Sequence, residues 1–202
     1  CSGDSFLFFL DNVIHKAFLD IANLPLTQYR GSRLYHPVTA DLTHLPFRNQ
    51  SFDLISALDV LEHIKNDEKA ISEMSRILKL GGIVVLTVPH RMKYYSKQDQ
   101  IIGHYRRYEL DQIYSLFKKY NLYEKRTFGV YGQFMRIADI QSFNPEKTEK
   151  NLLKHRTRYL KNPIFQKIWN MVVKISSKFM KVDAKYHSLR RIMNIGLILS
   201  KK

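Results

Sequence analysis

The segment covering residues 41–64, DLTHLPFRNQSFDLISALDVLEHI, constrains the fold of this chain more than any other part. Its first half ends in Pro46-Phe47, and a proline disfavours helix at the residue before it. Its second half contains FDLISAL, the short apolar run expected of a central strand. These features predict a turn that leads into a buried β-strand.

The residues after this segment complete a strand–helix–strand unit. Apolar side chains recur at helical spacing, and the pattern stops at Gly81-Gly82; its members are Ile64, Ala70, Ile71, Met74, Ile77 and Leu78. The next run, IVVLTVP, is continuous and β-branched, which is typical of a strand buried on both faces. Because no hairpin turn separates the two strands, we predict a right-handed crossover and an α/β fold.

Composition limits the remaining choices. The 202 residues fit one domain with an elaboration. The 33 Lys and Arg against 18 Asp and Glu give a net charge of +15. This charge attracts phosphate, nucleic acid, anionic lipid or acidic substrates, although a generic basic surface is the alternative.

The single cysteine, Cys1, excludes an internal disulfide and a cysteine-based zinc site. No apolar run is long enough for a membrane span and the start lacks a signal peptide, so we expect a cytoplasmic protein.

Two acidic residues lie at the ends of two strands predicted before this segment. Residues 15–21 are predicted to form one strand, with Asp20 near its end, and residues 24–31 a short helix. Residues 33–40 are predicted to form the other strand, and Asp41 follows it directly. Ligands of open α/β sheets bind beyond the carboxyl ends of the strands. We therefore expect Asp20 and Asp41 to lie on one rim.

These motifs together resemble one enzyme family. The order Asp41, LPF at 45–47, SFDLI at 51–55, LEHI at 61–64, RILK at 76–79 and GG at 81–82 is similar to the class I S-adenosylmethionine (SAM)-dependent methyltransferases, in particular their small-molecule, type-11-like subgroup. The resemblance implies a Rossmann-like three-layer sandwich, with a mostly parallel sheet, an antiparallel C-terminal strand and, here, a C-terminal helical insertion. The first strand of that fold is not in this sequence, and we expect an N-terminal piece to precede Cys1.

The resemblance also implies a cofactor site. Gly3 would be the last glycine of the turn that approaches the methionine end of SAM, Asp20 would bind the ribose hydroxyls, and Asp41 would accept a hydrogen bond from the adenine amino group. The other implied cofactor contacts are Ser2, Ile21, Leu42, Ala57 and Leu58. The alternative for Asp41 is a turn or helix-cap carboxylate, but the LPF and SFDLI motifs that follow it favour adenine binding.

The methyl group would lie near Glu62 and His63. Methyl transfer from a sulfonium is an in-line displacement, so the protein must align donor and acceptor and remove one proton. His63 and His104 are the candidate bases, although His63 also fits a positioning role at the start of the helix.

The sequence GHYRRY at 103–108 recurs in a subgroup of these methyltransferases, many of which act on glycans or lipid-linked sugars, and it precedes a predicted helix at 110–120. As a lid, Arg106, Arg107 and Tyr108, with His104, would recognise a carboxylate or phosphate of the substrate, and Glu62 is a further candidate substrate contact. Alternatively, one arginine pairs with a carboxylate such as Asp59 or Glu62 and locks the lid.

We expect the whole chain to divide into three parts. Residues 1–130 would form the SAM-binding core, residues 131–190 a basic helical insertion, and residues 191–202 a final edge strand antiparallel to a strand at 122–130. In the insertion one helical stripe is apolar and flanked by lysines; it comprises Ile164, Phe165, Ile168, Trp169, Val172, Ile175 and Phe179. Such a stripe packs against its own domain or a second copy, or else residues 163–182 contact an anionic membrane surface.

The predicted function is SAM-dependent methylation, at oxygen or nitrogen, of a small-molecule, glycan or lipid-linked acceptor, with S-adenosylhomocysteine as product and no metal. Two alternatives remain. The basic charge suits an RNA acceptor, although no RNA-binding module is evident. A noncatalytic binding or scaffold protein could retain the same fold.

Overall fold

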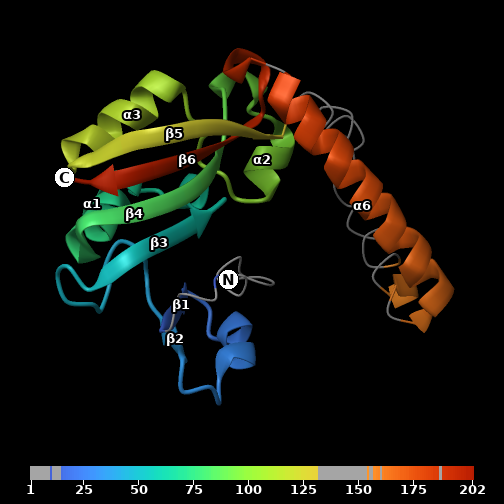
Figure 1. Cartoon of the computed structure of the whole chain (residues 1–202), viewed down its shortest axis with the longest axis horizontal. Coiled ribbons are helices and arrows are strands. Elements are labelled where there is room, and N and C mark those ends of the chain that lie inside the picture. The colour runs from blue at the N-terminus through green and yellow to red at the C-terminus, as the bar shows by residue number, and fades with distance from the viewer. Residues whose placement is uncertain (1–9, 11–14, 132–153, 155–156, 160, 187) are drawn as a thin grey trace.

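The computed structural model describes residues 10, 15–131, 154, 157–159, 161–186 and 188–202 (Figure 1). The proposed cofactor contacts Ser2 and Gly3 lie outside these residues. The described part contains a two-stranded sheet, a four-stranded sheet and a long C-terminal helix. The two-stranded sheet lies on the β3 side of the four-stranded sheet, where β3 covers Phe52–Leu58 (Figure 1).

The two-stranded sheet matches the prediction for residues 15–40. Strand β1, Lys16–Asp20, pairs in parallel with β2, Tyr35–Thr39, and the 3-10 helix η2, Leu24–Tyr29, connects them. A small core of its own stabilises this unit, in which the rings of Phe18 and Tyr29 stack with centroids 3.9 Å apart.

The four-stranded sheet has the order β3-β4-β6-β5. Its other strands are β4, Leu78–Pro89, β5, Leu122–Tyr131, and β6, Asn194–Lys201. Strand β4 is parallel to β3, and β6 is antiparallel to both β4 and β5, so β6 alone runs against the other three. This arrangement confirms the α/β fold with a mostly parallel sheet and an antiparallel C-terminal strand.

The last strand is not at the edge of the sheet, which corrects one expectation. Strand β6 lies between β4 and β5, and β5 is the edge. The physical reason is composition: β6 reads NIGLILSK and is almost wholly buried, whereas β5 carries Glu124, Lys125 and Arg126, whose charges suit an exposed edge. Gly196 of β6 is required by packing, because a Cβ at this position would lie 2.4 Å from the ring of Phe128.

Helix α1, Asp67–Ile77, ends earlier than the sequence pattern predicted. Asn66 caps its N-terminus by accepting a hydrogen bond from the backbone N–H of Lys69 at 3.1 Å. The helix ends before the glycine pair because Leu78 is fully buried and already pairs with Phe52 in the sheet. The glycines instead fall in an irregular part of β4, where Gly81 has a φ of +75°.

Helices α1 and α3, Leu110–Lys119, cover one face of the four-stranded sheet. Val84, Leu86 and Val88 of β4 point toward them, with the opposing residues of β6 on the same face. The two helices also contact each other, since Ser75 Oγ donates a hydrogen bond to the carbonyl oxygen of Tyr120 at 2.7 Å. This core holds the carboxyl ends of β3 and β4 in place.

Short helices connect these elements. They are η3, Leu61–His63, η4, Met92–Tyr94, α2, Lys97–Ile101, and η5, Leu189–Arg191. Sequence patterning did not predict α2, which is barely more than one turn long and lies within what was read as a loop.

Helix α6, Pro163–Tyr186, extends away from the sheets, with its N-terminal end farthest from them (Figure 1). Most of its apolar stripe is exposed, for example Ile164, Ile168 and Phe179. In the described part of the chain, most of this stripe therefore does not pack against the protein's own domain. Within the described residues, no helix is both long and apolar enough to cross a membrane.

Candidate functional site

Acidic and histidine side chains follow the carboxyl ends of the strands. Asp20 ends β1, Asp41 follows β2, and Asp59 follows β3. Asp20 and Asp41 share one edge because β1 and β2 are parallel, and the backbone N–H of Ala40 donates to the carbonyl oxygen of Asp20 at 3.0 Å. This edge is where open α/β sheets bind ligands.

Both aspartates accept hydrogen bonds from the turns that follow them. Asp20 Oδ1 accepts from the backbone N–H of Ala22 at 2.9 Å, and Asp41 Oδ1 accepts from that of Thr43 at 2.8 Å. The hydrogen bonds from Thr43 lower the pKa of Asp41. Partial burial acts to raise the pKa of Asp20, but hydrogen bonds to the carboxylate outweigh it and the pKa is lowered. Both groups are therefore ionised acceptors at neutral pH.

The other expected cofactor contacts in the described residues differ in how far they are exposed to solvent. Ile21 is 76% exposed beside Asp20, and Leu42 is half-buried and packs against the main core. Ala57 is buried within β3, whereas the neighbouring Leu58 is exposed. Their contact with a cofactor remains a prediction.

An ion pair holds the segment after Asp41 against α1. Arg76 donates to the carbonyl oxygens of Leu45 and Phe47 at 2.9 and 2.7 Å, while Glu73 Oε2 accepts from the backbone N–H of Leu45 at 2.9 Å. Hydrogen bonds from Arg76 lower the pKa of Glu73 to about 2. The LPF motif and the arginine of RILK are thus parts of one clasp, which sequence reasoning recorded as separate motifs.

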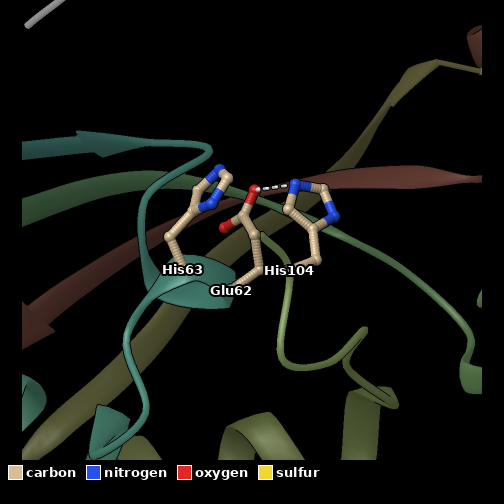
Figure 2. Close-up of side chains that lie close together, drawn as sticks. All are labelled: Glu62, His63 and His104. Atoms are coloured by element: carbon tan, nitrogen blue, oxygen red, sulfur yellow. Dashed lines mark ion pairs between the residues drawn. The ribbon is translucent and has the colours of Figure 1, made fainter. Parts of the chain in front are cut away.

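A second group of side chains gathers beyond β3. Glu62 and His63 come from η3, and His104 comes from the loop after α2, with the Glu62 carboxylate between the two imidazole rings (Figure 2). Glu62 Oε1 lies 3.8 Å from His104 Nε2, and the ring centroids of His63 and His104 are 4.5 Å apart. The backbone N–H of Tyr105 donates to the carbonyl oxygen of Glu62 at 2.8 Å, which joins the two segments.

Glu62 is buried without hydrogen-bond partners. Its side chain is 1% exposed, and no group in the described part of the chain donates a hydrogen bond of ordinary geometry to either carboxylate oxygen. Burial raises the pKa of Glu62 to about 8; its own backbone amide opposes this effect, and the charge of Asp59 adds to it. The charge of Arg107 acts to lower the pKa but does not outweigh burial, so Glu62 is mostly protonated at neutral pH.

Asp99 fixes the orientation of His104. Its carboxylate accepts from His104 Nδ1 at 2.8 Å, from Arg107 at 2.9 Å and from the backbone N–H of Ser96 at 2.7 Å. Burial acts to raise the pKa of Asp99, but these hydrogen bonds outweigh it and lower the pKa. Burial lowers the pKa of His104, although its bond to Asp99 opposes this. His104 is therefore neutral at pH 7, with its proton on Nδ1 and a lone pair on Nε2.

Several known proteins are similar to this chain in sequence or in fold. Residues 11–86 match the family model described as a methyltransferase domain. Over 84 residues the chain is 33% identical to the probable tRNA methyltransferase 9B of Bos taurus, a match that covers 39% of this chain and 18% of that protein. Over 52 residues it is 38% identical to norajmaline N-methyltransferase of Rauvolfia serpentina, covering 25% of this chain and 18% of that protein.

A solved structure extends the likeness over most of the chain. Phosphoethanolamine N-methyltransferase 2 of Haemonchus contortus, in complex with S-adenosyl-L-methionine, superposes with a TM-score of 0.55 at 19% identity, covering 92% of this chain and 43% of that one. Residues 11–86 of this chain are therefore homologous to a methyltransferase domain. The chain spans about a fifth of the length of each of these two curated relatives.

In this methyltransferase fold, the side chains of the GHYRRY motif make internal contacts. Arg106 pairs with Asp67 at 2.6 Å, Arg107 pairs with Asp99 at 2.9 Å, and the hydroxyl of Tyr108 donates to Asp67 at 2.8 Å. The locking role considered for the motif therefore describes what the structure contains, but with Asp67 and Asp99 as partners in place of Asp59 and Glu62. Contact of Arg106, Arg107 and Tyr108 with a substrate remains a prediction.

Proposed function

We propose that this protein transfers a methyl group from SAM to an oxygen or nitrogen atom of a small-molecule, glycan or lipid-linked acceptor. One observation carries the proposal: Asp20 and Asp41 end two parallel strands as ionised acceptors on one edge. Carboxylates there suit the ribose hydroxyls and the adenine amino group, all of which donate hydrogen bonds. The clasp between Glu73 and Arg76 supports the role of Asp41 by holding the segment that follows it.

The chemistry requires alignment and the loss of one proton. As the methyl group leaves the sulfonium sulfur, the acceptor atom forms the new bond, S-adenosylhomocysteine is left neutral, and the acceptor proton passes to a base. His104 suits this role better than His63, because Asp99 keeps its proton on Nδ1 and leaves Nε2 able to accept another. His63 Nδ1 has only a 3.3 Å contact with the carbonyl oxygen of Gly103.

We also propose an anionic acceptor presented at a membrane surface. The support is α6, where exposed apolar side chains such as Trp169 and Phe179 lie among the exposed Lys167, Lys174 and Lys178. Such a helix can lie in the headgroup region of an anionic bilayer. Beside it, a shallow hollow of about 440 Å³ is lined by Lys154, Thr157, Arg158, Lys161 and Asn162.

An RNA acceptor is the second candidate. It is favoured by the net charge of +15 and by the likeness to a probable tRNA methyltransferase. Salt dependence separates the two acceptors, since phosphate-backbone contacts weaken steeply with salt whereas buried apolar contacts do not. An affinity for tRNA that survives moderate salt and prefers one tRNA would favour the RNA candidate.

Calorimetric titration of the full chain with S-adenosylhomocysteine tests the cofactor proposal. We expect one site per chain, with affinity reduced at least about 10-fold in Asp41→Ala and in Asp20→Ala, because each loses a charge-assisted hydrogen bond. Asp53→Ala is the matched control, since Asp53 is an exposed carboxylate that pairs with Lys79 at 2.8 Å. No binding by the wild-type chain, or equal binding by all variants, would refute the proposal.

A further inference from the structure

The cluster beyond β3 brings together three potential metal ligands. Glu62, His63 and His104 each offer one ligand atom, and these three atoms lie within 4.8 Å of one another. Two adjacent residues come from η3, and the third comes from a loop 41 positions later, so tertiary structure builds the arrangement (Figure 2). The backbone hydrogen bond between Tyr105 and Glu62 fixes the two segments against each other.

The hydrogen bonds around the cluster prepare His104 to bind a cation. Because the Asp99 carboxylate can only accept, His104 Nδ1 carries the proton and Nε2 presents its lone pair toward Glu62. A carboxylate behind a histidine is the usual outer partner of a metal-bound imidazole. Asp99 is itself held by Arg107 and by Ser96, so its orientation is fixed before any ion binds.

Glu62 supplies the observation that points to a ligand. Its carboxylate is buried, faces the two imidazoles, and receives no hydrogen bond from any described residue. The nearby guanidinium of Arg107 is occupied by Asp99 and does not bond to Glu62. Buried carboxylates without partners are rare, and coordination of a cation is one of the few ways to satisfy both oxygens.

We propose that Glu62, His63 and His104 form a binding site for one divalent transition-metal ion of the Zn²⁺ class. Two imidazole nitrogens and one carboxylate oxygen are the protein ligands of open zinc sites and of related iron(II) sites, whereas Mg²⁺ and Ca²⁺ prefer oxygen alone. Ligand atoms about 2.1 Å from one ion lie no more than about 4.2 Å apart, so side-chain movements of about 1 Å close the site. This proposal differs from the sequence-based expectation of no metal.

The site lies at the carboxyl end of β3, where the acceptor is expected. Resting on the proposed methyltransferase function, an ion with an open position here would bind the acceptor oxygen and lower the pKa of its hydroxyl. With the ion bound to Nε2, His104 would not act as the base, and the acceptor proton would pass to water instead. Metal binding itself does not depend on SAM. It is therefore measured without cofactor, and a failure of either proposal can be recognised separately.

The test is Zn²⁺ titration of the untagged full chain after treatment with a chelator, followed by Co²⁺ titration with visible absorption. We expect one Zn²⁺ per chain, Co²⁺ bands typical of nitrogen and oxygen ligands, and no displacement by millimolar Mg²⁺. Glu62→Gln and His104→Gln should abolish this binding, while Asp99→Asn should weaken it by about 10–100-fold through the orientation of His104. Circular dichroism and S-adenosylhomocysteine binding check that each variant is folded.

His36→Gln is the matched control. His15 Nδ1 and His36 Nε2 lie 3.2 Å apart and form a second histidine pair, which could also attract zinc, although among the described residues it does not belong to a group of three potential ligands. Zn²⁺ binding that persists in His36→Gln and is lost in folded Glu62→Gln supports the site. Binding that is lost in His36→Gln but kept in Glu62→Gln, or no binding by the wild-type chain, overturns it.

Discussion

Replacement of Glu62 by glutamine should make stability less dependent on pH. In the folded protein the pKa of Glu62 is raised from its ordinary value of 4.5 to about 8 because the carboxyl group is buried. Between these two values the unfolded chain releases a proton that the folded chain keeps. The contribution of Glu62 to the free energy of unfolding is therefore favourable below pH 4.5 and is lost as the pH rises toward 8.

The magnitude follows from the interval between the two pKa values. Each pH unit in this interval lowers the free energy of unfolding by about 1.4 kcal/mol, and the whole interval corresponds to at most about 5 kcal/mol. Glutamine keeps the shape of the side chain but does not titrate. Glu62→Gln should therefore gain stability relative to the wild type steadily from pH 5 to pH 8.

Urea unfolding of both proteins at pH 5, 6, 7 and 8, in the presence of a chelator, measures this difference. The other titrating groups are shared and largely cancel in the comparison. Parallel stability profiles for wild type and Glu62→Gln would show that Glu62 is already ionised in the folded protein and would refute the reasoning. Saturation of the wild type with Zn²⁺ should reduce the slope, because the ion compensates the buried charge.

Three further predictions test separate parts of the structure. Arg76→Ala should lower the free energy of unfolding by about 1–3 kcal/mol in urea melts, because Glu73 and two loop carbonyls lose their hydrogen-bond partner. It should also weaken S-adenosylhomocysteine binding. Unchanged binding would show that the clasp does not position Asp41. Gly196→Ala should lower the free energy of unfolding by about 1–3 kcal/mol, because the new Cβ would lie 2.4 Å from the Phe128 ring. In a Phe128→Leu background the loss caused by Gly196→Ala should be smaller. Equal losses with Phe128 and with Leu at this position would contradict the contact. The emission of Trp169, the single tryptophan, should shift to the blue with anionic vesicles and stay unchanged with zwitterionic ones; no shift with either would contradict membrane contact through α6.

Local patterns predicted most of the strands because each strand is a short apolar run with a turn at its end. Strands β1 to β6 all fall within a few residues of the predicted ranges. The end of α1 was wrong because the apolar pattern continues through Leu78, which belongs to the sheet, and the glycine pair is a bulge and not a helix stop. The position of β6 inside the sheet depends on strand pairing, which periodicity alone does not specify.

The candidate site was predictable only in part. Glu62, His63 and His104 were selected from motifs, but Asp99 was not, because nothing in the local sequence marks it as the partner of His104. For the same reason, the sequence left Arg107 open as a substrate contact or as the partner of a carboxylate and did not identify Asp99 as that partner. Partners from different elements meet only after folding, so residue types predicted which side chains matter and the structure shows which of them interact.

Saturation-transfer NMR with S-adenosylhomocysteine and the full chain tests the central claim most directly. We predict strong transfer to the adenine and ribose protons, because the edge formed by Asp20 and Asp41 would contact them. The adenine signal should be lost in Asp41→Ala and kept in Asp53→Ala, the exposed control. Absence of transfer to the nucleoside, or equal transfer in both variants, would contradict the assignment of this edge as the cofactor site.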